Sequence, residues 1–379
     1  MTSTPPGRAA TRSGGDRCPG ALSPFVSADG AVVRLRLPGG WVATAVLRRV
    51  SELAARWGDP RITLTSRGSV QVRGLPDPQP AELVACLAAT GTIPSDSHER
   101  ARNIVADPLE PDLRPVVDRL DAALLARPEL AALPGRFLLA VARPGGPALG
   151  TPHDVALVVD PGERTAHVVT AGRAWTGPLE EAVVVLTEAL TRFLRLRPDE
   201  RTWNIADLDE QARAAVLPEA CLPRSGVAEV GAPPAPGRHG DALVAHVPLG
   251  LLEPAHVAAL ADVAPEVQVT PWRSIVVPTA AEHAAARLAE VGLVLDPTSP
   301  WTVVSACTGA PGCARTDVPT QDIARASEPG LDPDGPPVHV IGCERACGHP
   351  SRPYVQVLRP ASAAQVTAAQ RSATPTRTR

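Results

Sequence analysis

The stretch RITLTSRGSVQVRGL, from Arg61 to Leu75, alternates apolar and polar residues with a period of two. That period predicts a half-buried β-strand. A first strand is expected before it at residues 31–37, and a helix between the two over Val42–Arg56. The breaker PDPQP then closes a strand–helix–strand unit, and a short helix is expected over Ala81–Ala89.

The same order of elements recurs in the second half of the chain. The expected elements there are strands at Asp241–Gly250 and Glu266–Pro278 and helices at Glu253–Ala264 and Ala280–Gly292. When the two units are superposed, Thr65–Arg67 falls near Thr270–Arg273 with an offset of one residue. Each unit is therefore expected to carry an arginine inside its second strand, and the repeat predicts a pseudo-twofold α+β molecule.

The charge and composition of the chain limit the classes of function. The 379 residues have a net charge of −3, and all 37 basic side chains are arginine. This balance argues against a nucleic-acid partner, and no apolar run reaches the about 18 residues of a membrane helix. The leader at residues 1–17 lacks the apolar core of a secretory signal. We expect a cytoplasmic, monomeric protein with reduced thiols.

Four of the seven cysteines lie in two short pieces, SACTGAPGCARTDV and VIGCERACGHP. They are spaced as Cys307-x5-Cys313 and Cys343-x3-Cys347. Structural zinc sites usually space their cysteines by two to four residues, whereas iron–sulfur clusters accept wider spacing. The spacing favours an iron–sulfur cluster over zinc or unliganded thiols, and all three readings remain open at this point.

The other three cysteines carry less information. Cys86 lies in a helical run and is expected in the core, while Cys18 and Cys221 have no partner that the sequence identifies.

The cysteine spacing resembles the signature of the sirohaem-dependent sulfite and nitrite reductases. In that family four thiolates hold a [4Fe–4S] cluster, the last one also bridges to the sirohaem iron, and ferredoxin-like half-domains are repeated. Further stretches resemble the precorrin-3B synthases of aerobic cobalamin biosynthesis, a branch of the same superfamily. These stretches are CPG at Cys18–Gly20, DGAVVRLRLPGG at Asp29–Gly40, LTSRGSVQVRGL at Leu64–Leu75 and VTPWR at Val269–Arg273.

The resemblance implies a fold with mixed α/β reductase-like domains beside the ferredoxin-like repeat. The expected division is a disordered leader at 1–17, half-domains at 18–92 and 241–299, a reductase-like α/β domain at 93–230, a linker at 231–240, a cluster-binding segment at 300–360 and a disordered tail at 361–379.

The activity implied by this branch is the O2-dependent hydroxylation of precorrin-3A at C20, followed by closure of a γ-lactone by the ring-A acetate. The implied cofactors are the [4Fe–4S] cluster on Cys307, Cys313, Cys343 and Cys347 and a mononuclear non-haem iron. The implied partners are the tetrapyrrole, O2 and an electron donor such as NADH or a ferredoxin-like protein. Sirohaem is expected only if the chain is instead a small sulfite or nitrite reductase.

Arginine forks suit the many carboxylates of a tetrapyrrole. The resemblance therefore assigns a set of side chains to the substrate: Arg67, Gln71, Arg102, Asn103, Arg136 and Arg273. Gln71 is expected on the same strand face as Arg67. Each of these residues could equally be a surface or structural side chain. No catalytic residue is identified, and His153, Asp317 and His349 do not form a recognisable set of iron ligands.

One position bears on the choice between the two enzymes. Arg136 stands where the reductases carry the first lysine of a proton-donating triplet, and Leu138 takes the third position of that triplet. Reduction of sulfite or nitrite consumes protons, so its site needs polar donors, which leucine cannot supply. We therefore favour the hydroxylase. A third hypothesis, motivated by the same two residues, is a cluster protein that carries or senses a tetrapyrrole without catalysis.

Overall fold

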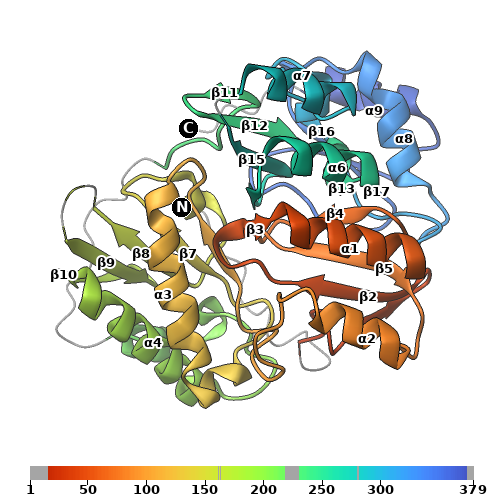
Figure 1. The fold of residues 1–379 in the computed structure, drawn as a ribbon. Helices are drawn as coiled ribbons and strands as arrows, with labels where there is room; N and C mark the ends of the chain where they lie inside the picture. The colour runs from red at the N-terminus through yellow and green to blue at the C-terminus, as the bar shows by residue number, and fades with distance from the viewer. Residues whose placement is uncertain (1–15, 161, 163, 218–229, 280, 374–379) are drawn as a thin grey trace. The chain divides into compact units, whose positions relative to one another are not determined.

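The computed structural model describes residues 16–160, 162, 164–217, 230–279 and 281–373 (Figure 1). The chain folds into two compact units, each of which is assembled from separate segments. The first unit holds the described residues up to Phe25, Leu35–Gly40 and Thr92–Pro233. The second unit holds Val26–Arg34, Trp41–Gly91 and the described residues from Pro234 onward.

The first unit is built on one five-stranded sheet in the order β10-β9-β8-β7-β6. Its strands are β6 (Ile104–Ala106), β7 (Leu139–Ala142), β8 (Val155–Val159), β9 (Thr165–Thr170) and β10 (Arg173–Pro178), and its helices are α3 (Arg114–Leu125), α4 (Leu179–Leu196) and α5 (Glu210–Ala215). The pairs β6–β7 and β7–β8 are parallel, and the pairs β8–β9 and β9–β10 are antiparallel. Helices α3 and α4 lie side by side in Figure 1. This is the mixed α/β domain that the sequence predicts.

The residues just before β7 alternate between two buried layers. Phe137 packs its ring 4.8 Å from that of Phe193 on α4. Leu138 points the other way, into a buried cluster that includes Val105 and Ala140. Successive side chains of an extended chain face opposite sides, and at this point both sides are packed.

The second unit contains the repeat as two five-stranded sheets of matching order, β1-β2-β5-β4-β13 and β11-β12-β15-β14-β3. The first half supplies β1 (Phe25–Ser27), β2 (Gly30–Leu35), β3 (Trp41–Ala43), α1 (Thr44–Trp57), β4 (Ile62–Leu64), β5 (Val70–Leu75) and α2 (Ala81–Ala88). The second half supplies β11 (Gly237–His239), β12 (Ala242–His246), β13 (Leu251–Leu252), α6 (Pro254–Val263), β14 (Glu266–Val269), β15 (Ser274–Pro278) and α7 (Glu282–Glu290). The predicted pseudo-twofold α+β fold is confirmed.

Each half completes the sheet of the other. Strand β3 leaves its own half and pairs with β14, where Val42 lies opposite Val267. In return β13 pairs with β4, where Leu252 lies opposite Ile62. Helices α1 and α6 pack against each other. Because an unpaired sheet edge is unfavourable, this exchange ties the two halves into one body, a feature that the sequence pattern does not predict.

The prediction of two long strands at Arg61–Leu75 and Glu266–Pro278 is wrong in one respect, because a turn divides each of them into two shorter strands. In the first, the Thr65 amide donates to the Ser69 carbonyl at 2.9 Å; in the second, Thr270 donates to Ser274 at 2.9 Å. Arg67 therefore lies in a turn and not in mid-strand, and it shares no strand face with Gln71 of β5. The alternation on either side of the turn has the same period as an unbroken strand, so the period conceals the break.

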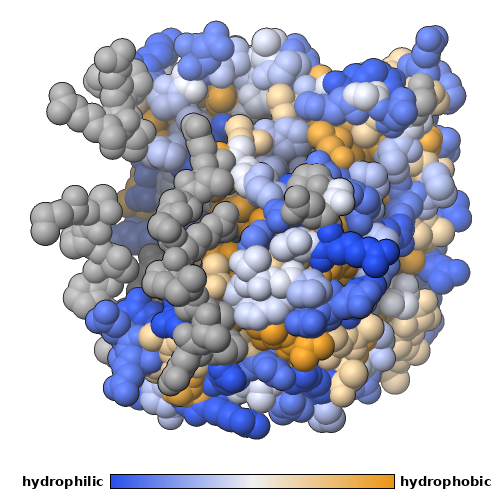
Figure 2. Space-filling view, turned by 90° about the vertical axis from the view of Figure 1, so that its left-hand side faces the viewer, coloured by the Kyte–Doolittle hydropathy of each residue, from blue (hydrophilic) through white to orange (hydrophobic). Residues whose placement is uncertain are grey.

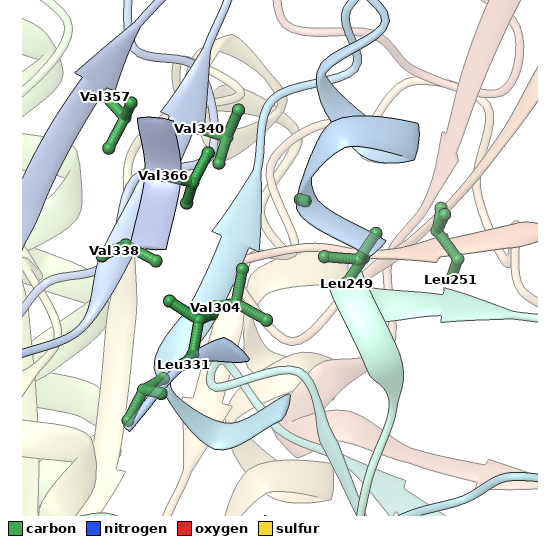
Figure 3. Packing of buried hydrophobic residues seen from close by; sticks show 10 residues of the cluster. Leu249, Leu251, Val304, Leu331, Val338, Val340, Val357 and Val366 are labelled. Atoms are coloured by element: carbon green, nitrogen blue, oxygen red, sulfur yellow. The ribbon is translucent and has the colours of Figure 1, made fainter. Parts of the chain in front are cut away.

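The C-terminal part of the second unit adds a small parallel sheet in the order β16-β17-β18. Its elements are β16 (Val304–Ala306), α8 (Thr320–Ser327), β17 (Val338–Ile341), β18 (Val355–Leu358) and α9 (Ala363–Ser372). Figure 3 shows Val338, Val340 and Val357 of the sheet grouped with Val366 of α9. Leu249 and Leu251, from the end of the β12–β13 connection, belong to the same buried cluster, so this sheet is packed on the second half-domain.

The predicted disordered tail and linker need correction within the described residues. Helix α9 lies inside the expected tail, and Val366 and Gln370 on it are buried, because Val366 fills the core beside β17 and β18. Strand β11 lies inside the expected linker at 231–240 and forms a sheet edge. Residues 1–15 of the leader and 374–379 of the tail lie outside the described residues, as does Cys221.

The described surface is mainly polar. Figure 2 shows a face on which hydrophilic residues predominate and apolar residues form separate patches. Among the described residues, the exposed large apolar side chains are Phe25, Val26, Val184 and Leu358. Within the described residues, every helix is too short or too polar to cross a bilayer.

Candidate metal centre and substrate-binding residues

Two of the four predicted ligands follow neighbouring parallel strands. Cys307 comes directly after β16, and Cys343 comes two residues after β17. The Cys307 amide donates to the Val340 carbonyl at 2.9 Å, which extends the ladder up to the cysteine. The carboxyl ends of parallel strands meet at one edge of a sheet, so both thiols are delivered to the same edge.

The loop that carries Cys313 is held by the first half-domain. The Gly312 carbonyl accepts hydrogen bonds from the Ser27 hydroxyl at 2.8 Å and from the Arg73 guanidinium at 3.0 Å. Arg73 is itself paired with Asp29 at 3.1 Å. The loop also packs closely on α8, where a Cβ on Gly309 would lie 2.3 Å from the Thr320 hydroxyl. Residues remote in sequence therefore position the second cysteine.

Cys343 and Cys347 share a tight turn. The Ala346 amide donates to the Cys343 carbonyl at 3.2 Å, and Ala346 has a positive φ of 46°. Just before this turn, the Gly342 amide donates to the Cys307 sulfur at 3.4 Å. A backbone N–H aimed at a sulfur is the kind of contact that stabilises a thiolate.

The pKa of Cys347 is influenced by the other three cysteines. Burial raises the pKa of Cys347, and the thiols of Cys307, Cys343 and Cys313 raise it further, while Arg345 lowers it. Four sulfurs within range of one another resist simultaneous ionisation unless a positive charge compensates them. A cationic metal group is the natural counter-charge for such a set.

The described side chains do not form a ready site for a single metal ion. Among the described residues, no three His, Cys, Asp or Glu side chains are arranged to hold one metal ion directly. The four cysteine sulfurs nevertheless interact through space and derive from one sheet edge and the two loops beside it. The preference for an iron–sulfur cluster over zinc therefore rests on the sequence spacing Cys-x5-Cys and Cys-x3-Cys.

A buried histidine supports the Cys347 turn from beneath. His339 on β17 is fully buried, its Nε2 lies 3.1 Å from the Cys347 carbonyl, and its Nδ1 lies 2.9 Å from the Ser305 hydroxyl. Burial and the charge of Arg273 lower the pKa of His339 to about 4, so the imidazole is neutral. His349, which the sequence left unassigned, stacks on Tyr354 and its Nδ1 lies 2.9 Å from the Pro350 carbonyl.

Arg273 reaches the same turn from the second half-domain. It adopts a φ of 60°, in the left-handed region that is unfavourable for any residue with a Cβ. Its guanidinium donates to the Gly348 carbonyl. Burial, and then the neighbouring Arg352, lower its pKa to about 10, which leaves it charged at neutral pH. The predicted substrate residue therefore also supports the backbone next to Cys347.

Arg67 and Gln71 occupy different settings. Arg67 is half-buried in the Thr65–Ser69 turn, where its amide donates to the Thr65 hydroxyl at 3.3 Å. Gln71 on β5, with its amide in the orientation that satisfies both groups, accepts two bonds from the Arg34 guanidinium at 2.8 and 3.1 Å. Gln71 is thus engaged by Arg34.

Arg102 and Asn103, in the first unit, are used internally. Arg102 forms a bidentate pair with Asp121 at 2.7 and 2.6 Å and donates to the Thr92 carbonyl at 3.0 Å. The Asn103 amide donates to the Arg100 and Gly135 carbonyls and accepts from Arg36. Both side chains are buried, and these bonds account for most of their capacity. A structural role explains them without a ligand.

Arg136 keeps an exposed guanidinium. It lies over the Trp203 ring at 5.0 Å and its Nε is 3.3 Å from Asp16, while 45% of its side chain remains exposed. Among the predicted residues of the first unit, it is the one best placed to meet a ligand.

Leu138 does not line an open site. It is 2% exposed, and its amide donates to the Asp154 carboxylate at 2.9 Å. Its apolar character therefore follows from core packing, so the lack of a polar donor at Leu138 gives no reason to prefer the hydroxylase over the reductase.

The remaining candidates have structural surroundings. Cys18 is buried and its sulfur accepts from Arg36 at 3.6 Å. Its CPG motif ends in Gly20, where a Cβ would lie 2.0 Å from the Glu99 carboxylate. Burial lowers the pKa of His153, whose Nδ1 lies 2.8 Å from the Thr151 carbonyl. Cys86 lies on α2, half-buried.

Sequence reasoning missed the residues that hold the cysteine loops. Arg73 and His339 contact those loops, but neither lies in a cysteine motif. A signal was present for His339, because a histidine inside the apolar run VHVI is out of pattern for a buried parallel strand. No local signal marks Arg73, whose partner is 239 residues away.

This chain is similar to proteins of two related groups. Residues 26–90 match the family described as the nitrite/sulfite reductase ferredoxin-like half domain. A protein from a Sinorhizobium species named precorrin-3B synthase is 26% identical, and the match covers 88% of this chain and 78% of the relative. The resemblance drawn from the cysteines and the repeat is thereby confirmed.

A solved structure shares the fold. The NirA protein of Mycobacterium tuberculosis superposes with a TM-score of 0.62 at 18% identity, over 84% of this chain and 69% of NirA. At that identity the likeness concerns the fold alone.

Proposed function

We propose that this chain, a relative of a precorrin-3B synthase built on the ferredoxin-like repeat of nitrite and sulfite reductases, is an oxidoreductase that hydroxylates precorrin-3A at C20 with lactone formation. The observation that supports the proposal is the placement of Cys307 and Cys343 just after the neighbouring parallel strands β16 and β17, with Cys347 in the turn that follows Cys343. The relative named precorrin-3B synthase supports the choice of substrate.

The four cysteines would hold a [4Fe–4S] cluster, which supplies single electrons when bound. The overall reaction adds one atom of O2 to the substrate and reduces the other to water, so it consumes two electrons and two protons. We propose NADH or a ferredoxin-like protein as their source. The atom that activates oxygen, a mononuclear non-haem iron in the proposal, has no ligand set among the described residues.

Only some of the residues that the family resemblance assigns to the tetrapyrrole keep that role in the proposal. Arg67 in its turn and Arg136 with its exposed guanidinium are the proposed carboxylate partners, because a guanidinium pairs bidentately with a carboxylate. Gln71, Arg102 and Asn103 are proposed to be structural, since their polar atoms bond to Arg34, Asp121 and Arg36 respectively. Arg273 is proposed to support mainly the backbone next to Cys347, through its hydrogen bond to the Gly348 carbonyl.

The test uses protein purified without oxygen. Incubation with precorrin-3A, NADH and a reductase, and 18O2 should yield a product heavier by one labelled oxygen atom. Unchanged substrate in the presence of an intact cluster would contradict the proposal.

A haem-type absorption band in the purified protein would instead indicate the alternative, a small sirohaem sulfite or nitrite reductase. Tight tetrapyrrole binding without turnover under all donors would indicate a carrier.

A further inference from the structure

The hydrogen bonds of His339 define which nitrogen carries its proton. The Cys347 carbonyl can only accept, so the Nε2 that lies 3.1 Å away must donate. In the neutral imidazole the other nitrogen then accepts. The Ser305 hydroxyl lies 2.9 Å from this nitrogen and 3.2 Å from the Val338 carbonyl, and its one proton is shared between these two acceptors. The Cys347 carbonyl thus selects the tautomer, and the Ser305 hydroxyl fixes the position of the ring from the other side.

The sheet register makes this arrangement rigid. Ser305 on β16 and His339 on β17 are direct partners in the parallel ladder. Both side chains are buried, and the ring of Tyr354 closes the edge of the imidazole in a T-shaped contact at 5.7 Å. A histidine fixed between two strands holds its N–H donor in one direction.

The carbonyl that His339 holds belongs to the fourth cysteine. Its neighbour, the Gly348 carbonyl, is held by Arg273. Two successive carbonyls of the Cys347 turn therefore receive donors from two different elements. A turn held in this way presents its side chain in one direction, and this matters most for a thiol that must reach a shared metal group.

We infer that His339, oriented by Ser305, is a positioning residue that holds the Cys347 turn in the geometry in which its thiolate binds the metal cluster. The inference rests on the proposed function, because it requires the cluster. It assigns Ser305 and His339 to the support of one ligand, and neither residue touches the substrate in this assignment.

The chain contains a matched control. His256 on α6 is buried, its Nε2 lies 2.9 Å from the Val291 carbonyl, and its Nδ1 accepts from the Glu253 amide at 3.0 Å. It therefore has the same hydrogen-bonding roles as His339 in the same unit, but it caps a helix away from the cysteine turns.

The test measures iron and sulfide per chain, and then the rate at which a ferrous chelator removes iron without oxygen. We expect His339→Asn, whose amide is too short to reach the carbonyl, to lose iron about 10- to 100-fold faster than the parent. His339→Gln, whose amide reaches the Nε2 position, should restore a rate near that of the parent. Ser305→Ala should fall between them, and His256→Asn should match the parent.

The outcomes separate two failures. A parent protein that binds no iron or sulfide would overturn the proposed function and this inference together. A loaded parent whose His339→Asn variant loses iron no faster than His256→Asn would overturn this inference alone. If His339→Asn does not fold, the comparison of Ser305→Ala with the parent decides, and equal rates overturn the inference.

Discussion

The two halves of the second unit carry the same turn but use it differently. In each turn a threonine hydroxyl, Thr65 or Thr270, accepts from two backbone amides of its own turn. The left-handed position is Gly68 with φ 61° in the first half and Arg273 with φ 60° in the second. The equivalent of Arg67 is therefore Trp272, which explains the one-residue offset between the two arginines.

The difference teaches that the fold repeats while the chemistry does not. Glycine meets the left-handed position without cost, and Arg67 precedes it in the turn. In the second half the arginine itself occupies the unfavourable position, and its guanidinium supports the Gly348 carbonyl. Only the second half is followed by the cysteine segment, so only its turn is used for that support.

The largest expected effect concerns this segment. Cys343→Ser should abolish bound iron and sulfide and destabilise the part of the second unit built on β16, β17 and β18, because metal binding contributes folding free energy. Cys86→Ser, on α2 of the first half, is the control and should retain the full iron content. Iron analysis and thermal unfolding measure both effects. A normal iron content in Cys343→Ser would contradict the assignment.

Acid should weaken the second half before the first. Residues 41–91 contain no histidine, whereas burial and the charge of Arg273 lower the pKa of the buried His246 to about 4. Because this value lies below that of the unfolded chain, stability is complete above about pH 6.5 and falls as the pH drops toward 4. His246 alone should contribute a loss on the order of 3 kcal/mol, and His339, whose pKa is also lowered to about 4, adds to it.

Urea unfolding at several pH values measures this dependence. His246→Leu removes one titrating group, so it should flatten the fall between pH 6.5 and 4 even if it lowers the stability at pH 7. An unchanged slope in this variant would show that another group is responsible.

The residues in the left-handed conformation, Gly68 and Arg273, allow the two halves to be compared by substitution. Gly68→Ala should destabilise the protein by about 1–2 kcal/mol, the cost of a Cβ in that conformation. Arg273→Gly relieves the same strain but loses the bond to Gly348, so its net effect on the free energy of unfolding should be close to zero. Arg273→Ala retains the strain and loses the bond, and should be the least stable of the three. Equal stability of the Gly and Ala variants at 273 would refute the strain argument.

The smallest expected effect is that of the two threonines. Thr65→Val and Thr270→Val each remove the hydroxyl acceptor of two amides and should cost about 1 kcal/mol. Thr270 should cost more, because its hydroxyl also bonds to Ser274 at 2.7 Å. Chemical unfolding of the two variants side by side checks the order, and the reverse order would show that the two turns are not equivalent.

Much of the architecture could be predicted from periodicity. The repeat and its helices α1 and α6 follow from apolar spacing along the chain, whereas the mixed α/β sheet of the first unit is what the family resemblance implies. The breaks at Thr65–Ser69 and Thr270–Ser274 could not be predicted, because the alternation has the same period on both sides of each turn. Helix α9 was missed because its apolar residues are few, and Val366 is buried only by the sheet beside it.

The sequence proposes the ligands of the candidate site but not the residues that support them. The spacing of Cys307, Cys313, Cys343 and Cys347 identifies a soft donor set because few metals accept four thiolates in that pattern. The substrate arginines were predicted by residue type alone, and residue type does not reveal a buried partner such as Asp121 beside Arg102. Leu138 shows the same limit, because the sequence does not distinguish an apolar residue in a core from one that lines a pocket.

The sequence by itself determined the repeated half-domains, the four thiols and the absence of lysine, because these are properties of composition and local spacing. Only the tertiary structure decided that β3 and β13 change places, that Arg73 secures the Cys313 loop, and that His339 and Arg273 hold the carbonyls of Cys347 and Gly348. The physical reason is that hydrogen bonds between particular residues 8, 75 or 239 positions apart leave no period in the chain. They exist only once packing has brought a donor and an acceptor together.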